Sequence, residues 1–238
     1  MAATLSLTEA NILKTLGNFL VSILPAGMPV FEAQLNRVSE PAASNYVSMT
    51  PMFQERLATN IDTLIQALFT GSIAAKVLTI THVFDGILVA GSSLFGANVT
   101  TGTVVLSQIS GTPGGIGTYS VNISQTANSA SVQAGTKTAQ QYTMVTMQLD
   151  IHGPASADNT QIISTMFRDE YAANFFEQSG YDIAPLYVGE PKQIPFQNAE
   201  QQYEFRWVLE VVMEANPIVT VPLQFAVALG PVVSHDVI

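Results

Sequence analysis

Two stretches of the chain, 142–152 and 201–214, alternate between hydrophobic and polar residues. The hydrophobic positions are Val145, Met147, Leu149 and Ile151 in the first stretch, and Tyr203, Phe205, Trp207, Leu209, Val211 and Met213 in the second. A period of two residues is typical of a β-strand with one buried and one polar face. We therefore predict two strands here and place Met147 and Trp207 in the core.

Between these strands, residues 156–178 repeat with the period of an amphipathic helix. One side of this helix would carry Ile162, Ile163, Met166, Phe167, Phe175 and Phe176. Ser156 is a suitable N-cap and Gly180 a suitable end. We predict a single helix whose Phe167 side packs on the sheet, so that Phe167 belongs to the core.

A second main helix is predicted near the start of the chain, capped by Thr8 and running to about Leu24. Residues 53–68 fit either the end of a strand or a short helix. Shorter strands are predicted over 28–36, 45–52 and 183–187.

The composition changes over residues 69–138, which contain ten of the sixteen glycines and only three charged residues, Lys76, Asp85 and Lys137. Short apolar runs separated by turns predict a small all-β inserted domain here. Residues 1–68 and 139–238 would then form a discontinuous core. The predicted fold class is α+β, with a β-sheet packed by two main helices and the inserted β domain.

Charged residues make up 11 % of the chain, far below the usual value of about 25 %. The uncharged surface is either covered by partners or a neutral surface rich in Thr and Ser. The net charge of −10 argues against a protein that grips nucleic acid through phosphates. No run of about 18 apolar residues occurs, so we expect no transmembrane helix and no membrane partner.

Residues suited to catalysis or metal binding are sparse. The chain has no cysteine, and its three histidines show no metal-ligand spacing. Gly114-Gly-Ile-Gly117 precedes a predicted strand instead of a helix, so it lacks the context of a phosphate loop. We expect no catalytic residues, no metal and no cofactor, and hence a protein that is not an enzyme.

Acidic residues gather late in the chain, with twelve of the eighteen from Asp150 onward against three basic residues. Glu204, Arg206, Glu210 and Glu214 share the polar side of the strand 201–214. Arg206 could pair across strands or between subunits. If the subunits formed a ring, the glutamates would line its lumen; otherwise they would meet solvent or pair with a neighbouring subunit. The last segment, 225–238, is mostly apolar and is either an interaction arm or docked on its own domain.

Several short motifs, in this order, resemble the neck or tail terminator proteins of tailed bacteriophages. They are Gln34-Leu-Asn-Arg37, Asn45-Tyr-Val-Ser-Met-Thr50, Gln148-Leu-Asp-Ile-His-Gly153, Ala155-Ser-Ala-Asp158, Ala184-Pro-Leu-Tyr187, Tyr203-Glu-Phe-Arg-Trp207, Asn216-Pro217 and Val219-Thr-Val-Pro222. The resemblance covers about 7–68 and 139–226. Residues 69–138 depart from it and look like a β module inserted in many phage structural proteins.

The resemblance implies a virion structural protein that is assembled in the host cytoplasm. Its subunits would form a ring, usually of six copies, that terminates the tail tube, joins it to the head connector and lets DNA pass without specific binding. Its partners would be other copies of the chain, the tail tube protein, the neck and connector proteins, and the sheath of a contractile tail. The alternative is a tail or surface binding module, in which the 69–138 domain contacts a host glycan or another virion protein.

Overall fold

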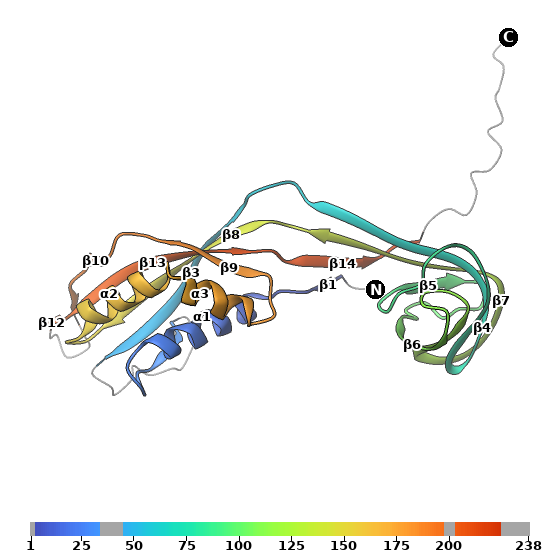
Figure 1. Cartoon of the computed structure of the whole chain (residues 1–238), viewed down its shortest axis with the longest axis horizontal. Coiled ribbons are helices and arrows are strands. Elements are labelled where there is room, and N and C mark those ends of the chain that lie inside the picture. The colour runs from blue at the N-terminus through green and yellow to red at the C-terminus, as the bar shows by residue number, and fades with distance from the viewer. Residues whose placement is uncertain (1–2, 34–44, 198–202, 225–238) are drawn as a thin grey trace, which may run out of the picture. The chain divides into compact units, whose positions relative to one another are not determined.

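A computed structural model describes residues 3–33, 45–197 and 203–224 (Figure 1). Contacts divide the chain into two compact units. The β unit comprises the described residues of 1–4, 61–139 and 219–238, and the sheet-and-helix unit comprises those of 5–60 and 140–218. Part of the predicted strand over 28–36 and the whole segment 225–238 lie outside the described residues.

The sheet-and-helix unit contains three helices and most of the shorter strands. Its helices are α1 (Glu9–Ile23), α2 (Ser156–Met166) and α3 (Glu170–Glu177). Its strands are β2 (Val30–Glu32), β3 (Tyr46–Arg56), β8 (Thr143–His152), β9 (Ile183–Val188), β10 (Lys192–Gln193), β11 (Phe196–Gln197), β12 (Tyr203–Glu204) and β13 (Arg206–Ala215).

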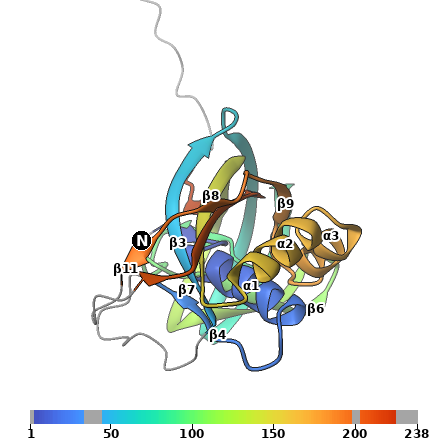
Figure 2. The same ribbon diagram turned by 90° about the vertical axis from the view of Figure 1, so that its left-hand side faces the viewer.

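The main sheet of this unit has the order β10-β13-β8-β3-β2, with β9 also paired to β13. At its centre, β13 and β8 pair antiparallel without irregularity from Arg206↔His152 to Ala215↔Thr143. The next strand, β3, follows β8 with a bulge between Pro51 and Phe53. Figure 2 shows the strands curling while the three helices lie together on one side of them. The sheet therefore has one helix-covered face and one helix-free face.

Hydrophobic burial explains why the helices lie on that face. One stripe of α1 is fully or nearly buried, and it joins one core cluster with the alternate residues of β8 and β13. The members of this cluster in the three elements are Ile12, Leu13, Leu16, Phe19, Leu20, Val145, Met147, Leu149, Ile151, Leu209, Val211, Met213 and Ala215. The helix begins with a capping box, in which Thr8 and Asn11 bond to each other's backbone N–H groups.

Phe19 is the hub of this core. Its ring is fully buried and lies 5.6–5.7 Å from the rings of Phe167, Phe175 and Phe176. The contacts with Phe167 and Phe175 are edge-to-face, which is a favourable arrangement of aromatic rings. Phe19 thus ties α1 to both of the other helices.

The prediction of one helix over 156–178 is wrong, because the chain forms two helices there. Asp169 accepts a hydrogen bond from the backbone N–H of Tyr171 at 2.9 Å and thereby caps α3. The N-cap of α2 is Ala155, without a side-chain cap bond, and Ser156 is the first helical residue. Phe167 lies buried between the two helices, whereas Ile162 is exposed.

The predicted fold class is also wrong. Strands make up 55 % of the structure and helices 17 %, so the fold is dominated by a curled, mostly antiparallel sheet instead of two main helices on a sheet. The described residues contain three short helices, the longest of which is α1 with 15 residues. Residues 53–68, for which strand and helix were both open, belong to β3 and β4 except for the connection 57–60. None of the helices in the described residues is long and apolar enough to span a membrane.

The β unit is built around two long strands, β4 (Ile61–Gly86) and β7 (Gly117–Gln140). The other strands of its sheet are β1 (Thr4–Leu5), β5 (Ser93–Gly96), β6 (Val105–Gly111) and β14 (Ile218–Pro222), in the order β1-β14-β7-β4 with β5 and β6 also on β7. A separate core fills this unit and includes Phe69, Leu78, Leu94, Val105, Tyr119 and Val121.

The strand β4 folds back on itself. Ile87 N donates to Gln66 O at 3.2 Å, and Thr81 Oγ1 donates to Thr70 O at 3.4 Å. The reversal occurs at Ala75, which has a left-handed backbone with φ of 54°. Such a conformation is typical of a tight hairpin turn.

We predict that Phe19→Ala destabilises the sheet-and-helix unit by about 3–5 kcal/mol, because it leaves a cavity among three aromatic rings. The matched control is Val21→Ala on the same helix, where the side chain is 59 % exposed. That change should stay within about 0.5 kcal/mol of the wild type. Urea unfolding measures both, and equal stabilities of the two variants would contradict the assignment of Phe19 to the centre of the core.

Candidate functional site

The helix-free face of the main sheet carries most of the polar residues that sequence analysis selected. Alternate residues of β3, β8 and β13 point to this face, which we call the open face. Its central members are Ser48, Thr50, Thr146, Gln148, Asp150, His152, Arg206, Val208, Glu210, Val212 and Glu214. Six of them are buried, namely Ser48, Thr146, Asp150, His152, Val208 and Val212, whereas Glu210 is exposed. The open face is therefore fixed by the same strand pairing that fixes the core.

An ion pair crosses the open face between β8 and β13. Arg206 Nε and Nη2 donate to Asp150 Oδ1 at 2.9 and 2.5 Å. Gln148 Nε2 donates to both oxygens of the same carboxylate at 3.0–3.1 Å. The Asp150 side chain is only 8 % exposed, so it needs these donors to offset its loss of hydration. Arg206 thus pairs across strands within one chain.

A row of rings borders this ion pair at one end of the open face. Tyr46 and His152 stack with their ring centroids 4.4 Å apart, and Phe31 lies 5.8 Å from Tyr46. Tyr46 and His152 are both buried, with 6 % of each residue exposed. These rings join β2, β3 and β8 and make this end of the face rigid.

The predicted acidic residues do not all lie together. Glu210 is exposed on the open face opposite Gln148, and Glu214 is half-buried and accepts a hydrogen bond from Asn216 Nδ2 at 3.1 Å. Glu204 lies instead on the separate strand β12, which pairs with β11 and is divided from β13 by Phe205. The structure brings Arg206, Glu210 and Glu214 to one face and leaves Glu204 off it.

Asp150, Gln148 and Glu55 also belong to this surface, although their sequence pattern did not single them out for it. Glu55 on β3 lies opposite Met144, which in turn lies opposite Glu214. The polar positions of the strand 142–152 were a signal for Asp150 and Gln148, whereas the uncertain structure of 53–68 hid Glu55. Of the three residues that sequence analysis placed in the core, Met147 and Phe167 are buried and Trp207 is half-buried next to Gln193.

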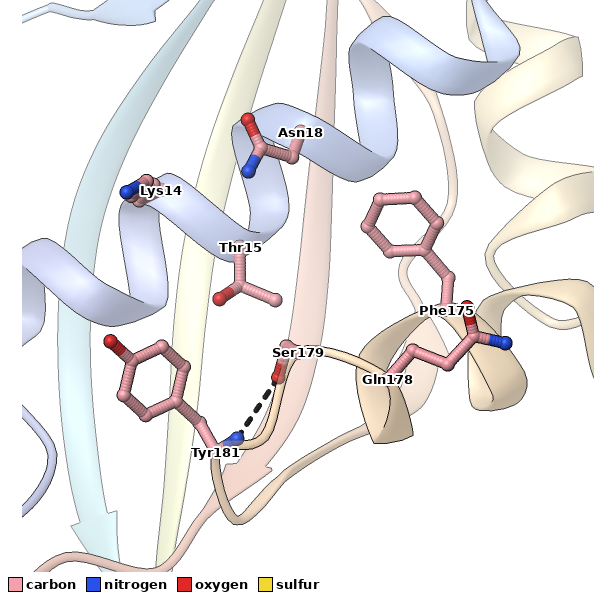
Figure 3. Close-up of a pocket in the computed structure, with 7 residues that line it drawn as sticks. All are labelled: Lys14, Thr15, Asn18, Phe175, Gln178, Ser179 and Tyr181. Atoms are coloured by element: carbon pink, nitrogen blue, oxygen red, sulfur yellow. Dashed lines mark hydrogen bonds between the residues drawn. The ribbon is translucent and has the colours of Figure 1, made fainter.

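One pocket borders the open face and is lined by Gly189, Glu190, Lys192, Val208 and Glu210, and others lie elsewhere. Figure 3 shows one between α1 and the chain after α3, lined by Lys14, Thr15, Asn18, Phe175, Gln178, Ser179 and Tyr181. Within it, Tyr181 N donates to Ser179 Oγ at 3.2 Å. This pocket holds one charged group and no histidine or carboxylate, so it offers no acid–base pair. No group of three potential metal ligands occurs in the described ranges.

The family model of the phage neck terminator protein matches residues 92–236. This chain belongs to that family. No curated protein matches the chain. Membership confirms the predicted resemblance and identifies a structural protein of the virion neck.

The range of the match differs from the range of the predicted resemblance. It begins at residue 92, inside the predicted inserted domain, and thus includes β5, β6 and β7. The matched range therefore includes residues 92–138. The match also contains β8 and β13, which carry Asp150, Arg206, Glu210 and Glu214.

For this neck terminator, we predict that Arg206→Met destabilises the fold by about 3–5 kcal/mol, because it leaves the buried Asp150 carboxylate without its cationic partner. The double variant Asp150→Asn, Arg206→Met should recover at least half of that loss, since no uncompensated charge remains. Urea unfolding of the single and double variants measures the coupling. If the double variant lost as much stability as the two single variants together, the ion pair would not hold the two strands.

Proposed function

We propose that the protein forms a homo-oligomeric ring at the head-proximal end of the tail. The ring terminates the tail tube, joins it to the head connector and lets DNA pass. The match to the neck terminator family over residues 92–236 carries this proposal. Six copies, contact with the tail tube and neck proteins, contact with the sheath of a contractile tail, and assembly in the host cytoplasm are the details that the resemblance implies.

Exposed apolar side chains in the sheet-and-helix unit support self-association. Tyr203 is 81 % exposed, Phe205 59 % and Phe53 54 %. Large exposed aromatic residues are enriched at protein interfaces, whereas single small apolar residues are common on any surface. Their exposure, together with a charged fraction of 11 %, favours a subunit whose surface is covered by partners.

The charges of the open face support its placement toward the lumen. Asp150 offsets the positive charge of Arg206, which leaves the acids Glu55, Glu210 and Glu214 as the excess on this face. An acidic wall repels phosphates and does not bind them, so DNA can move along it. The helices cover the other face of the sheet, and they would face outward in the ring.

The alternative role of the β unit is contact with another virion protein or with a host glycan. Its most exposed apolar residues are mostly aliphatic, with Leu64, Ile87, Leu106, Ile109 and Ile116 at 52–59 % and the aromatic Phe84 at 56 %. Aliphatic side chains suit an apolar protein surface better than a sugar, which presents hydroxyl groups. These residues favour a protein partner for the β unit.

The lumen assignment predicts the effect of charge reversal. The variant Glu210→Lys, Glu214→Lys should keep the oligomeric mass of the wild type in light scattering. Virions that carry it should eject DNA more slowly, because lysines on the wall bind phosphates, and added salt should relieve the delay.

The matched control is Glu170→Lys, Glu177→Lys, which makes the same change in charge on the exposed surface of α3. This control should eject DNA at the wild-type rate. Equal ejection rates for the two double variants would place the open face away from DNA. If only the Glu210→Lys, Glu214→Lys variant failed to assemble, Glu210 and Glu214 would lie in the subunit interface. A wild-type protein that stays monomeric at every concentration would contradict the ring.

A further inference from the structure

The strand β6 has an open edge. One edge of this strand pairs with β7. Along its other edge, residues 91–94 form backbone hydrogen bonds only as far as Val105. From Leu106 to Gly111 its other side has no strand partner within the described ranges, and all six residues are exposed. Such an edge presents backbone N–H and C=O groups that can pair with an added strand.

Two bulges turn apolar side chains of β6 outward. The pairing of β6 with β7 shifts between Val105 and Ser107 and again between Gln108 and Ser110. The residues skipped by these shifts are Leu106 and Ile109, which are 55 % and 58 % exposed. Bulges commonly redirect a side chain in this way. The open edge thus carries two large aliphatic groups.

The loop after β6 is held rigidly by hydrogen bonds. Gln108 Nε2 donates to Ser110 O at 3.2 Å and to Thr112 O at 2.8 Å, and Gln108 Oε1 accepts from Gly114 N at 3.2 Å. Tyr119 OH donates to Gly115 O at 2.7 Å, and burial raises the pKa of this phenol. A rigid edge loses little conformational entropy when it binds a strand.

Apart from its two bulges, the edge lacks the features by which proteins protect exposed strands. Residues 106–111, Leu-Ser-Gln-Ile-Ser-Gly, contain no charge and no proline. An uncharged and apolar strand would match this edge best, because it would bury Leu106 and Ile109 without burying a charge.

One segment of the chain has that chemistry. Residues 225–229, Phe-Ala-Val-Ala-Leu, alternate large and small apolar residues, carry no charge and stand before Gly230-Pro231. This alternation predicts a short strand. The chain reaches it from β14, where Leu223 N donates to Gly135 O at 3.1 Å. Both β6 and 225–229 lie inside the range 92–236 that the neck terminator family shares.

We propose that residues 225–229 of one copy add as a strand to the edge Leu106–Gly111 of the next copy. The proposal rests on the ring assembly proposed above and names one contact between neighbouring subunits of that ring. Every copy supplies one open edge and one strand, so head-to-tail pairing uses all of them when the ring closes. The segment would then link neighbouring β units.

Cysteine cross-linking tests this contact, because the chain contains no cysteine of its own. An Ile109→Cys protein is mixed with a Val227→Cys protein under mild oxidation. The proposal predicts covalent dimers at about ten times the yield of a Val77→Cys and Val227→Cys mixture, since a disulfide requires Cβ atoms about 3.8 Å apart. Val77 serves as the control because it is also exposed, at 38 %, but lies beside the hairpin turn of β4.

A second protein, with Ile109→Cys and Val227→Cys in one chain, separates the possible sources of the strand. Covalent ladders of several subunits support exchange between copies. A bond confined to single chains would overturn the proposal in favour of docking on the same copy. Equal yields with Val77→Cys, or no cross-link, in a protein that light scattering shows to be oligomeric would overturn this contact and leave the ring intact. A protein monomeric at every concentration would overturn both.

Discussion

The antiparallel pairing of β8 with β13 is the constraint on which the sheet-and-helix unit depends. It places Leu149 and Leu209 on the helix-covered face and Asp150 and Arg206 on the open face. A slip of one residue would bring charged groups to the helices and apolar groups to the open face. The ion pair and the buried core therefore select the same register, one through electrostatics and the other through the hydrophobic effect.

Local patterns predicted the elements of this pairing well. Alternation over 142–152 and 201–214 located β8 and most of β13, and Thr8 marked the start of α1. The break at Phe205 was missed because the alternation continues through it. Glu204 was consequently predicted on the same strand as Arg206, whereas it lies on β12.

Features set by tertiary contacts were harder to predict. The helical period continues across Asp169, yet the side chain of this residue caps a new helix. The length of β4 and its reversal at Ala75 depend on pairing between residues that are distant in sequence. Underestimating the strands and joining two helices produced the wrong fold class. The partner of Arg206 likewise required the register of two strands 56 residues apart.

The two units supply different kinds of surface for the proposed assembly in the neck. The sheet-and-helix unit offers an acidic face whose single arginine is held by Asp150, and the β unit offers an uncharged edge at β6. Acidic groups suit a surface past which DNA moves, and apolar strand edges suit contacts that persist. Electron cryomicroscopy of the virion neck tests this division most directly. The account predicts a ring of this protein with the open face toward the lumen and α1, α2 and α3 outward, and a ring lined by the helices, or none, would contradict it.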